Sequence, residues 1–158
     1  MSQPAQSVNI RKFMARHLVD VFEMMLSMKA SPVHDQAMPS CSERVTGTVG
    51  FAGEEITGAV YLHLSGKFAA RIAGAMLGLE EVSAEAEIND VVGEVTNMLA
   101  GGLKSVLCDA GTTCAVSTPA IIRGASFMIE SVPDVERIWL SFGCEGERVS
   151  VEVHVQYL

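Results

Sequence analysis

Hydrophobic residues recur every three or four positions in two long stretches of the chain, which predicts two long amphipathic helices. The first stretch covers residues 9–29, and the second runs from Glu87 to Ala110. Ser83 can cap the second helix, and acidic residues near its start favour the positive end of the helix dipole. One face of this helix is expected in a core because the apolar residues share it: Ile88, Val92, Val95, Leu99, Leu103 and Val106.

Shorter elements are expected between and after the long helices. Gly66–Leu77 is expected to form a helix, because Ser65 can accept its first amide hydrogen bond and Gly78 can end it. Ser-Pro and Met-Pro steps predict a loop over residues 30–42. A short strand is expected within Thr112–Thr118, and Ile121–Ile129 has room for another.

Runs rich in β-branched residues, separated by turn residues, predict two β-hairpins. The first joins Arg44–Ala52 to Glu55–Leu64, and the second joins Glu136–Phe142 to Arg148–Tyr157. Valines alternate with polar residues along the last strand, so one face of the sheet is expected to meet water. The polar residues on that face are Ser150, Glu152, His154 and Gln156.

The two hairpins resemble each other. Moving FAGEEITGAVYLHL by 91 residues places it on FGCEGERVSVEVHV, where three positions are identical: Phe51/Phe142, Glu54/Glu145 and His63/His154. Any two amphipathic hairpins share such a pattern to some degree, so the identities alone leave a duplication open. A long helix and a Pro-containing connection precede each hairpin, which favours two similar α/β halves in an α+β fold. The antiparallel sheet would then pack against the long helices.

Length and composition indicate one domain. The chain has 158 residues, 49% of them hydrophobic, which is enough for a core without disulfides or structural metals. We expect a single domain over residues 8–158 after a flexible tail of residues 1–7. The net charge of −8, with only 11 lysines and arginines, argues against nucleic acid as a partner. The four cysteines and four histidines show no metal-ligand spacing.

The chain shows no targeting or membrane-spanning pattern. Its N-terminal segment lacks the apolar stretch of a signal peptide. No run of about 18 apolar residues is long enough to cross a bilayer. We therefore expect a cytoplasmic protein that does not bind membranes.

The polar face of the second long helix carries an uncommon set of residues on one stripe: Asp90, Glu94, Asn97 and Gly101. Asn and Gly each destabilise a helix interior by roughly 0.5–1 kcal/mol relative to Ala. Their presence on a solvent-facing stripe favours contact with a close-fitting partner. Carboxylates near a helix N-terminus also stabilise the helix itself, so the spacing alone leaves a purely structural explanation open.

The segment EINDVVGEVTNMLAGGLKSVL, followed by STPAIIRG, resembles the signature region of the CheC/CheX family of chemotaxis phosphatases, which dephosphorylate the response regulator CheY. The family pattern is Asp or Ser, then Glu four residues on, then Asn three residues further, then a more distant Pro. In this chain the pattern falls on Asp90, Glu94, Asn97 and Pro119. The segment TGTVGFAGEEITGAVYLHLS also resembles the family.

The first long helix carries only a remnant of this pattern. Glu23 matches, but Val19 and Leu26 stand where the family has the acidic residue and the Asn. A single intact Glu/Asn motif makes the chain similar to CheX rather than to CheC, which has two.

The resemblance implies a phosphatase for a phosphorylated CheY-like response regulator, with a CheC-like fold. Glu94 and Asn97 would enter the regulator's active site, where Asn97 orients the attacking water. Asp90, Gly101 and Pro119 would contact the regulator. The resemblance also implies a homodimer formed through sheet edges. No cofactor is expected on this chain, and Mg²⁺ is expected in the partner's active site.

Two alternatives remain open at this point. The same helix face would also serve a non-catalytic module that binds a regulator or another signalling partner. A metal-dependent hydrolase would use Asp90 and Glu94 as direct ligands, but two carboxylates one helical turn apart, without a further ligand, make a poor metal site.

Overall fold

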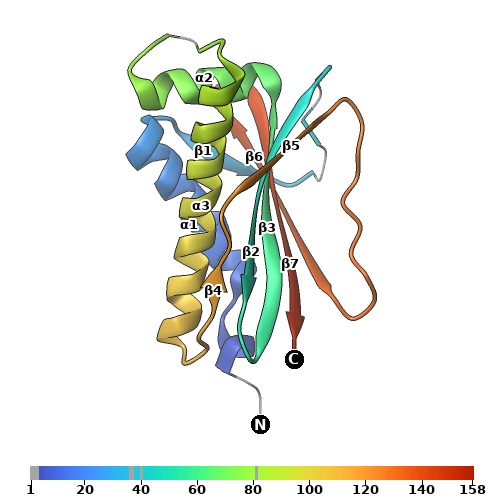
Figure 1. The fold of residues 1–158 in the computed structure, drawn as a ribbon. Coiled ribbons are helices and arrows are strands. Elements are labelled where there is room, and N and C mark those ends of the chain that lie inside the picture. The colour runs from blue at the N-terminus through green and yellow to red at the C-terminus, as the bar shows by residue number, and fades with distance from the viewer. Residues whose placement is uncertain (1–3, 36–37, 40, 81) are drawn as a thin grey trace.

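The computed structural model describes residues 4–35, 38–39, 41–80 and 82–158. Within these residues, α1 and α3 pack against one face of a seven-stranded antiparallel sheet, and α2 lies across one end (Figure 1). The sheet order is β1-β6-β7-β3-β2-β4, and β5 also pairs with β2. The elements are α1 (Ile10–Leu26), β1 (Ala30–Val33), β2 (Arg44–Ala52), β3 (Ile56–Ser65), α2 (Gly66–Leu77), α3 (Glu85–Asp109), β4 (Ala115–Val116), β5 (Ala120–Gly124), β6 (Glu136–Cys144) and β7 (Glu147–Tyr157). The predicted α+β class is confirmed.

The helix ends follow local sequence signals at α2 but not at α3. The Ser65 hydroxyl accepts the Phe68 amide at 3.0 Å, and Gly78 ends α2 with a left-handed φ of 73°. The cap predicted at Ser83 is wrong, because α3 begins at Glu85 after Ala84, whose side chain makes no capping hydrogen bond.

The loop predicted for residues 30–42 contains an additional strand. Ala30–Val33 forms β1 and pairs antiparallel with β6 at one edge of the sheet. The strand was not predicted because it contains Pro32, which lacks an amide hydrogen. A proline is tolerated on an edge strand, where one side of the strand makes no hydrogen bonds to a neighbour. The expected strand within Thr112–Thr118 shortens to β4, and Ile121–Ile129 does contribute strand residues, as β5.

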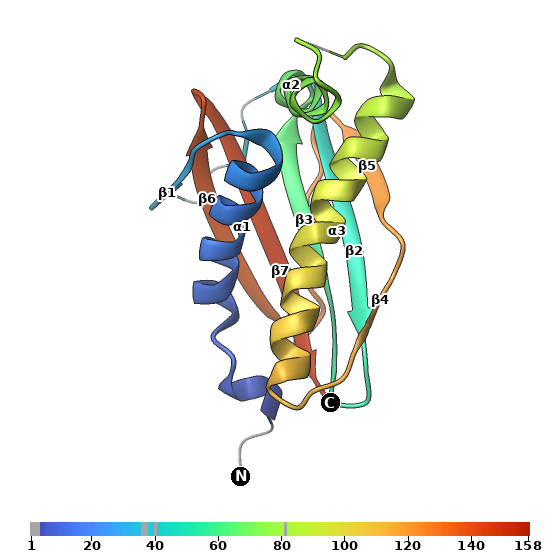
Figure 2. The ribbon, with the colours of Figure 1, turned by 90° about the vertical axis from the view of Figure 1, so that its left-hand side faces the viewer.

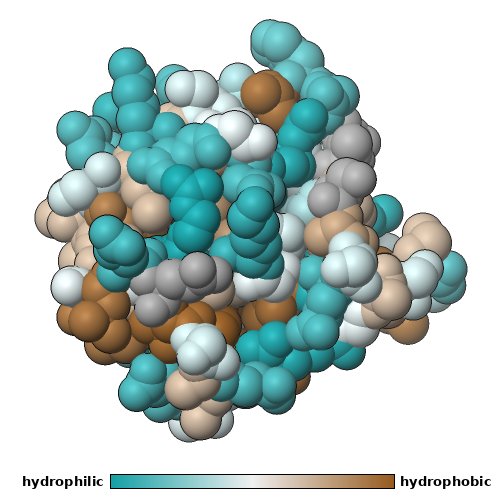
Figure 3. All heavy atoms as spheres, turned by 90° about the horizontal axis from the view of Figure 1, so that it is seen from above, coloured by the Kyte–Doolittle hydropathy of each residue, from teal (hydrophilic) through white to brown (hydrophobic). Residues whose placement is uncertain are grey.

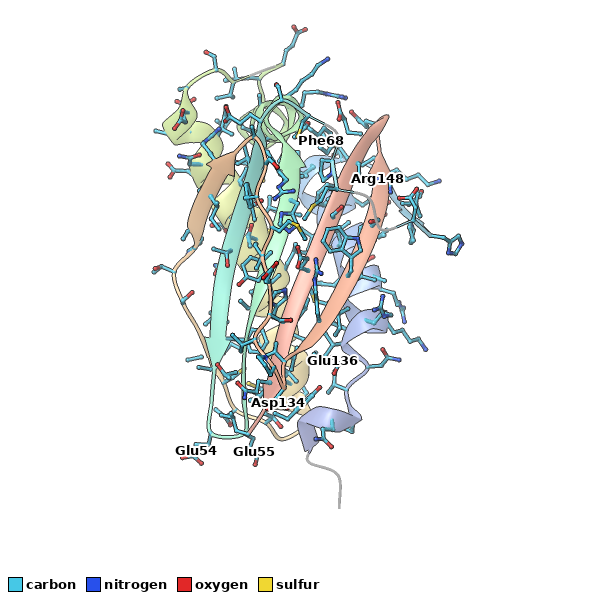
Figure 4. All side chains as sticks on the ribbon, turned by 90° about the vertical axis from the view of Figure 1, so that its right-hand side faces the viewer. Glu54, Glu55, Phe68, Asp134, Glu136 and Arg148 are labelled. Atoms are coloured by element: carbon cyan, nitrogen blue, oxygen red, sulfur yellow. The ribbon has the colours of Figure 1, made fainter. Side chains whose placement is uncertain are left out.

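The sheet face opposite α1 and α3 is not the wet surface that alternation predicted. Ser150, Glu152 and His154 are all buried there. The connection between β5 and β6, residues 125–135, crosses this face (Figures 1 and 4). Arg44 of β2 donates a hydrogen bond to the Phe127 carbonyl of this connection and stacks on the Phe127 ring. Alternation fixes which face a residue occupies, but it does not reveal that a distant loop covers that face.

The two halves of the chain are related in the sheet. The two hairpins, β2–β3 and β6–β7, have the same register once residue numbers are shifted by 91. The sheet order is also symmetric. The hairpin of each half is flanked by a strand from the other half, since β1 pairs with β6, and β4 and β5 pair with β2. β3 and β7 meet at the middle, where Tyr61 pairs with Glu152 at the same offset of 91. The predicted two-halved architecture is confirmed.

The α2 end of the molecule is mostly polar. Seen from the α2 end, hydrophilic side chains predominate and apolar groups form separate patches (Figure 3). Leu77 and Leu79, at the end of α2 and just beyond it, are exposed apolar residues. At the opposite end, Glu54 and Glu55 lie at the turn of the first hairpin (Figure 4). In the described part of the chain, no helix is long and apolar enough to cross a membrane.

The chain before α1 is only partly described. Pro4–Ser7 forms a short 3-10 helix, and residues 1–3 lie outside the described residues. The flexibility of residues 1–7 therefore stays a prediction.

Candidate functional site

Helix α3 separates a core face from a polar stripe, as its periodicity predicted. The apolar residues Ile88, Val92, Val95, Leu99 and Leu103 are buried, and Val106 packs on the core at its edge. On the opposite face Asp90 and Glu94 are exposed, while Asn97 and Gly101 are half-buried. Figure 2 shows α1 and α3 side by side and antiparallel, with β4 and β5 on the other side of α3.

The sheet side of α3 approaches β2 at a glycine. A Cβ atom on Gly47 would lie 2.0 Å from the Thr96 hydroxyl oxygen and 3.2 Å from a Val92 methyl carbon. Thr96 is fixed in turn, because its hydroxyl donates to the Val92 carbonyl at 2.7 Å. The absent side chain of Gly47 therefore allows α3 to lie directly on the strand.

The α1 side of α3 also has a close approach at a glycine. A Cβ atom on Gly102 would lie 2.1 Å from Nε2 of His17, and this nitrogen is 3.0 Å from the Met98 carbonyl oxygen. The Phe13 ring stacks on His17 with 5.1 Å between ring centroids. His17 thus links α1 to the middle of α3.

Pro119 reaches the motif helix from the connection between β4 and β5. A Cβ atom on Gly93 would lie 3.3 Å from the Cβ of Pro119. Pro119 is itself exposed and lies beside the residue that precedes Glu94. The structure therefore brings Pro119 to the same helix as the predicted stripe.

Arg123 of β5 anchors the start of α3. Its guanidinium donates to Asn89 Oδ1 at 2.7 and 3.1 Å and to Glu43 Oε1 at 2.7 Å. It also lies 3.6 Å from a carboxylate oxygen of Glu85 in the first turn of the helix. Sequence analysis missed this residue, since nothing in the pattern paired an arginine on one element with Asn89 on another.

The stripe itself has no internal partners. Among the described residues, no hydrogen bond or ion pair involves the side chains of Asp90, Glu94 or Asn97. A Cβ atom on Gly101 would meet no described atom within 4 Å. A carboxylate and a carboxamide one turn apart are thus presented to solvent on a helix held from three sides.

The metal-hydrolase alternative gains no further ligands from the fold. In the described ranges, no group of three or more His, Cys, Asp or Glu side chains is arranged to hold a metal ion. Asp90 and Glu94 therefore remain a pair of carboxylates without additional donors.

A second polar cluster lies on the opposite face of the sheet, and sequence analysis did not predict it. The Glu152 carboxylate is completely buried and accepts hydrogen bonds from three side chains. One oxygen accepts from His63 Nε2 at 2.9 Å, and the other from Arg137 Nε at 2.9 Å and His154 Nε2 at 3.0 Å. Thr46 lies 2.7 Å from the other nitrogen of His63. We call these five residues the Glu152 cluster.

The protonation of this cluster follows from its burial and hydrogen bonds. Burial alone would raise the pKa of Glu152, but hydrogen bonds from His63, His154 and Arg137 outweigh it and lower the pKa to about 2. Burial lowers the pKa of His63, against the opposing effect of Glu152. A neutral His63 donates to Glu152 and accepts from the Thr46 hydroxyl, which satisfies both ring nitrogens.

The fold and the polar stripe define an α+β domain that exposes the polar face of one helix. Comparison with known proteins identifies its family. The family model for the chemotaxis phosphatase CheX matches residues 45–143, which include all of α3 and Pro119. The chain therefore belongs to the CheX family of chemotaxis phosphatases, as its resemblance implied. No curated protein sequence matches it significantly.

Solved structures confirm the CheC-like fold. CheX from Vibrio vulnificus superposes with a TM-score of 0.82 at 23% identity, covering 99% of this chain and 100% of that chain. A CheC-like superfamily protein from Shewanella sp. PV-4 gives 0.76 at 24% identity and covers 99% of both chains. The CheX–CheY–BeF3–Mg²⁺ complex from Borrelia burgdorferi gives 0.70 at 20% identity, covering 94% of this chain and 99% of that chain.

Proposed function

We propose that the protein accelerates aspartyl-phosphate hydrolysis in a phosphorylated CheY-like response regulator by inserting Glu94 and Asn97 into the regulator's active site. The observation that carries this proposal is the pair of an exposed Glu94 and a half-buried Asn97 on the firmly held helix α3, neither with a side-chain partner among the described residues. Membership of the chemotaxis phosphatase family supports it. So does the similar Borrelia CheX, which forms a complex with CheY.

In the hydrolysis of an aspartyl phosphate, most of the catalytic groups belong to the regulator, so this protein needs to supply little more than the orientation of the water. An aspartyl phosphate hydrolyses by in-line attack of water, and a Mg²⁺ held by the regulator's own carboxylates neutralises the developing charge. Asn97 suits the orientation of this water, because its carboxamide oxygen accepts a hydrogen bond while its NH₂ group stays available for another contact. The carboxamide needs no particular protonation state. Holding the water in line lowers the entropic part of the barrier.

The other stripe residues bind the regulator in this proposal. Glu94 pairs with the active-site lysine of the regulator and sets the register of α3. Asp90 contacts the edge of the same site. Gly101 presents bare backbone, so the partner can approach the helix closely. Pro119 shapes the surface beside Gly93.

The test is the decay of a phosphorylated CheY-like regulator from the same genome, measured with Mg²⁺ and with or without this protein. We expect faster decay with the parent protein, and loss of most of the acceleration in Asn97→Ala with binding retained. Equal rates for Asn97→Ala and the parent would refute the water-orienting role. Binding without any acceleration by the parent would instead support the alternative of a non-catalytic binding module.

The predicted homodimer through sheet edges and the cytoplasmic location stay predictions. The two ends of the sheet order are formed by β1 and β4, which are short strands of four and two residues. Size-exclusion chromatography with light scattering would test the dimer directly, and elution at the mass of one chain would refute it.

A further inference from the structure

A basic groove lies beside α3, the helix that carries the polar stripe. It has a volume of about 570 Å³ and runs between α1 and the second half of α3. Its lining includes Lys12, Phe13, Arg16 and His17 from α1 and Val106 from α3. His17 touches both the groove and Gly102, and Gly102 is next to Gly101 of the stripe. His17 therefore connects the groove to the part of α3 that follows Gly101.

The groove has two rows of side chains with different chemistry. Lys12 and Arg16 lie one helical turn apart and are exposed. Phe13 and His17, also one turn apart, stack and form an aromatic wall. Asp20 is the acidic residue among the lining side chains. The combination suits a segment that carries carboxylates and an apolar side chain.

Arg16 differs from the other arginines in having no acceptor among the described residues. Each of the others donates to one: Arg11 to Trp139, Arg44 to Phe127, Arg71 to Glu145, Arg123 to Asn89 and Glu43, Arg137 to Glu152 and Arg148 to Asp35. The Lys12 ammonium likewise makes no ion pair within the described ranges. The chain has a net charge of −8, so these two positive side chains one turn apart, without an acidic partner among the described residues, make a local basic site.

We propose that this groove is a second docking surface for the regulator, with Lys12 and Arg16 binding an acidic surface segment beside the regulator's active site. The inference rests on the proposed function and extends it to a part of the chain outside the Glu/Asn motif. The two cations would also reduce an electrostatic repulsion. Asp90 and Glu94 approach a site whose own carboxylates hold Mg²⁺, so negative charges face each other across the interface. Lys12 and Arg16 would offset this repulsion and steer the encounter.

The test measures binding of a CheY-like regulator from the same genome, activated with BeF3 and Mg²⁺, by calorimetry at low and high salt. The test variant is the double change Lys12→Glu/Arg16→Glu. The control is Lys29→Glu, an exposed lysine beyond the other end of α1. The steady-state KM and kcat for the phosphorylated regulator are measured for the same proteins.

We expect the double variant to raise Kd and KM about tenfold at low salt while kcat stays within about twofold. The difference in Kd should shrink at high salt, because salt screens the attraction between exposed charges. The screening length is about 10 Å at 0.1 M ionic strength and shortens as salt is added. Lys29→Glu should bind as the parent does.

Two results would overturn the proposal, and they differ in what they mean for the phosphatase. If the parent binds and the double variant binds equally well, the groove is not a docking surface and the proposed function stands. If the parent neither binds nor dephosphorylates regulators of this kind, both proposals are wrong.

Discussion

The Glu152 cluster and the stripe on α3 each contain a glutamate, but in opposite surroundings. In the Glu152 cluster the carboxylate is buried, and it accepts hydrogen bonds from three side chains. The stripe on α3 is open to solvent, and its carboxylates and carboxamide have no partner within the described residues. A buried charge must be satisfied inside the fold, whereas an exposed polar group remains available to another molecule.

This difference separates stability from function in the same small domain. The Glu152 cluster holds the middle of the sheet together, because its residues come from four strands, β2, β3, β6 and β7. The stripe contributes little to the fold and even includes residues that weaken a helix. Substitutions in the two clusters should therefore act on different measurements.

The largest effect should come from Glu152→Ala. Removing the carboxylate leaves the buried ring N–H groups of His63 and His154 without an acceptor, which costs about 1–3 kcal/mol each, while the exposed Arg137 can bind water instead. Chemical denaturation should show this loss, while the dephosphorylation rate per folded molecule stays unchanged. Gln156→Ala, on the same strand face but only half-buried, should change stability by less than about 0.5 kcal/mol. Equal effects of the two substitutions would contradict a stabilising role for the cluster.

Asn97→Ala should give the converse result. We expect the rate of regulator dephosphorylation to fall about 100-fold, which corresponds to about 2.7 kcal/mol in the barrier. Stability should not fall, because the side chain makes no contact that the fold needs and Ala favours a helix. Parallel unfolding curves and decay assays check both parts, and a clear loss of stability would mean that Asn97 is part of the structure.

Acid should act on the Glu152 cluster first. The folded pKa of His63 is lowered, so the unfolded chain takes up this proton more readily. Stability is therefore full above the ordinary histidine pKa of about 6.5 and falls below it, by at most about 1.4 kcal/mol per pH unit for this one group. Glu152, with its pKa of about 2, adds a further loss as the pH falls below its unfolded value of 4.5.

Denaturation midpoints at pH 7.5 and 5.5 check the histidine contribution. His63→Gln keeps a polar side chain but removes the titrating group, so its stability should depend less on pH in this window. The same pH dependence in the variant and the parent would assign the acid sensitivity to another group.

A smaller effect on function should come from Gly101→Ala. An added Cβ meets nothing there, so the variant should be more stable by up to about 1 kcal/mol through helix propensity alone. Binding of the activated regulator should nevertheless weaken severalfold, because the methyl group occupies the surface that we assign to the partner. Gly47→Ala is the contrasting variant, since its Cβ would collide with Thr96 and should destabilise the fold. Unchanged binding by Gly101→Ala would remove Gly101 from the proposed interface.

The elements that the sequence predicted well are those defined by local signals. Residues close in sequence determine both ends of α2, at Ser65 and Gly78. They also determine the two hairpins and the buried face of α3. The missed features depend on distant ones. Strand β1 with Pro32 exists because β6 pairs with it, and the sheet face that carries Glu152 is crossed by residues 125–135. The position of Pro119 beside Gly93 likewise needed the fold.

The pairing of Tyr61 with Glu152 at the centre of the sheet has a consequence for the symmetry of the molecule. The two residues are equivalent positions of the two halves, so each faces its own counterpart. Two glutamates here would bring like charges together in a buried place, where one of them would have to remain protonated. The tyrosine ring instead lies edge-on to His154, 5.1 Å between ring centroids. The charge of Glu152 is thus tolerated at the middle of the sheet because the equivalent residue of the other half is the tyrosine Tyr61. Two identical copies of either half could not form this Tyr61–Glu152 pair.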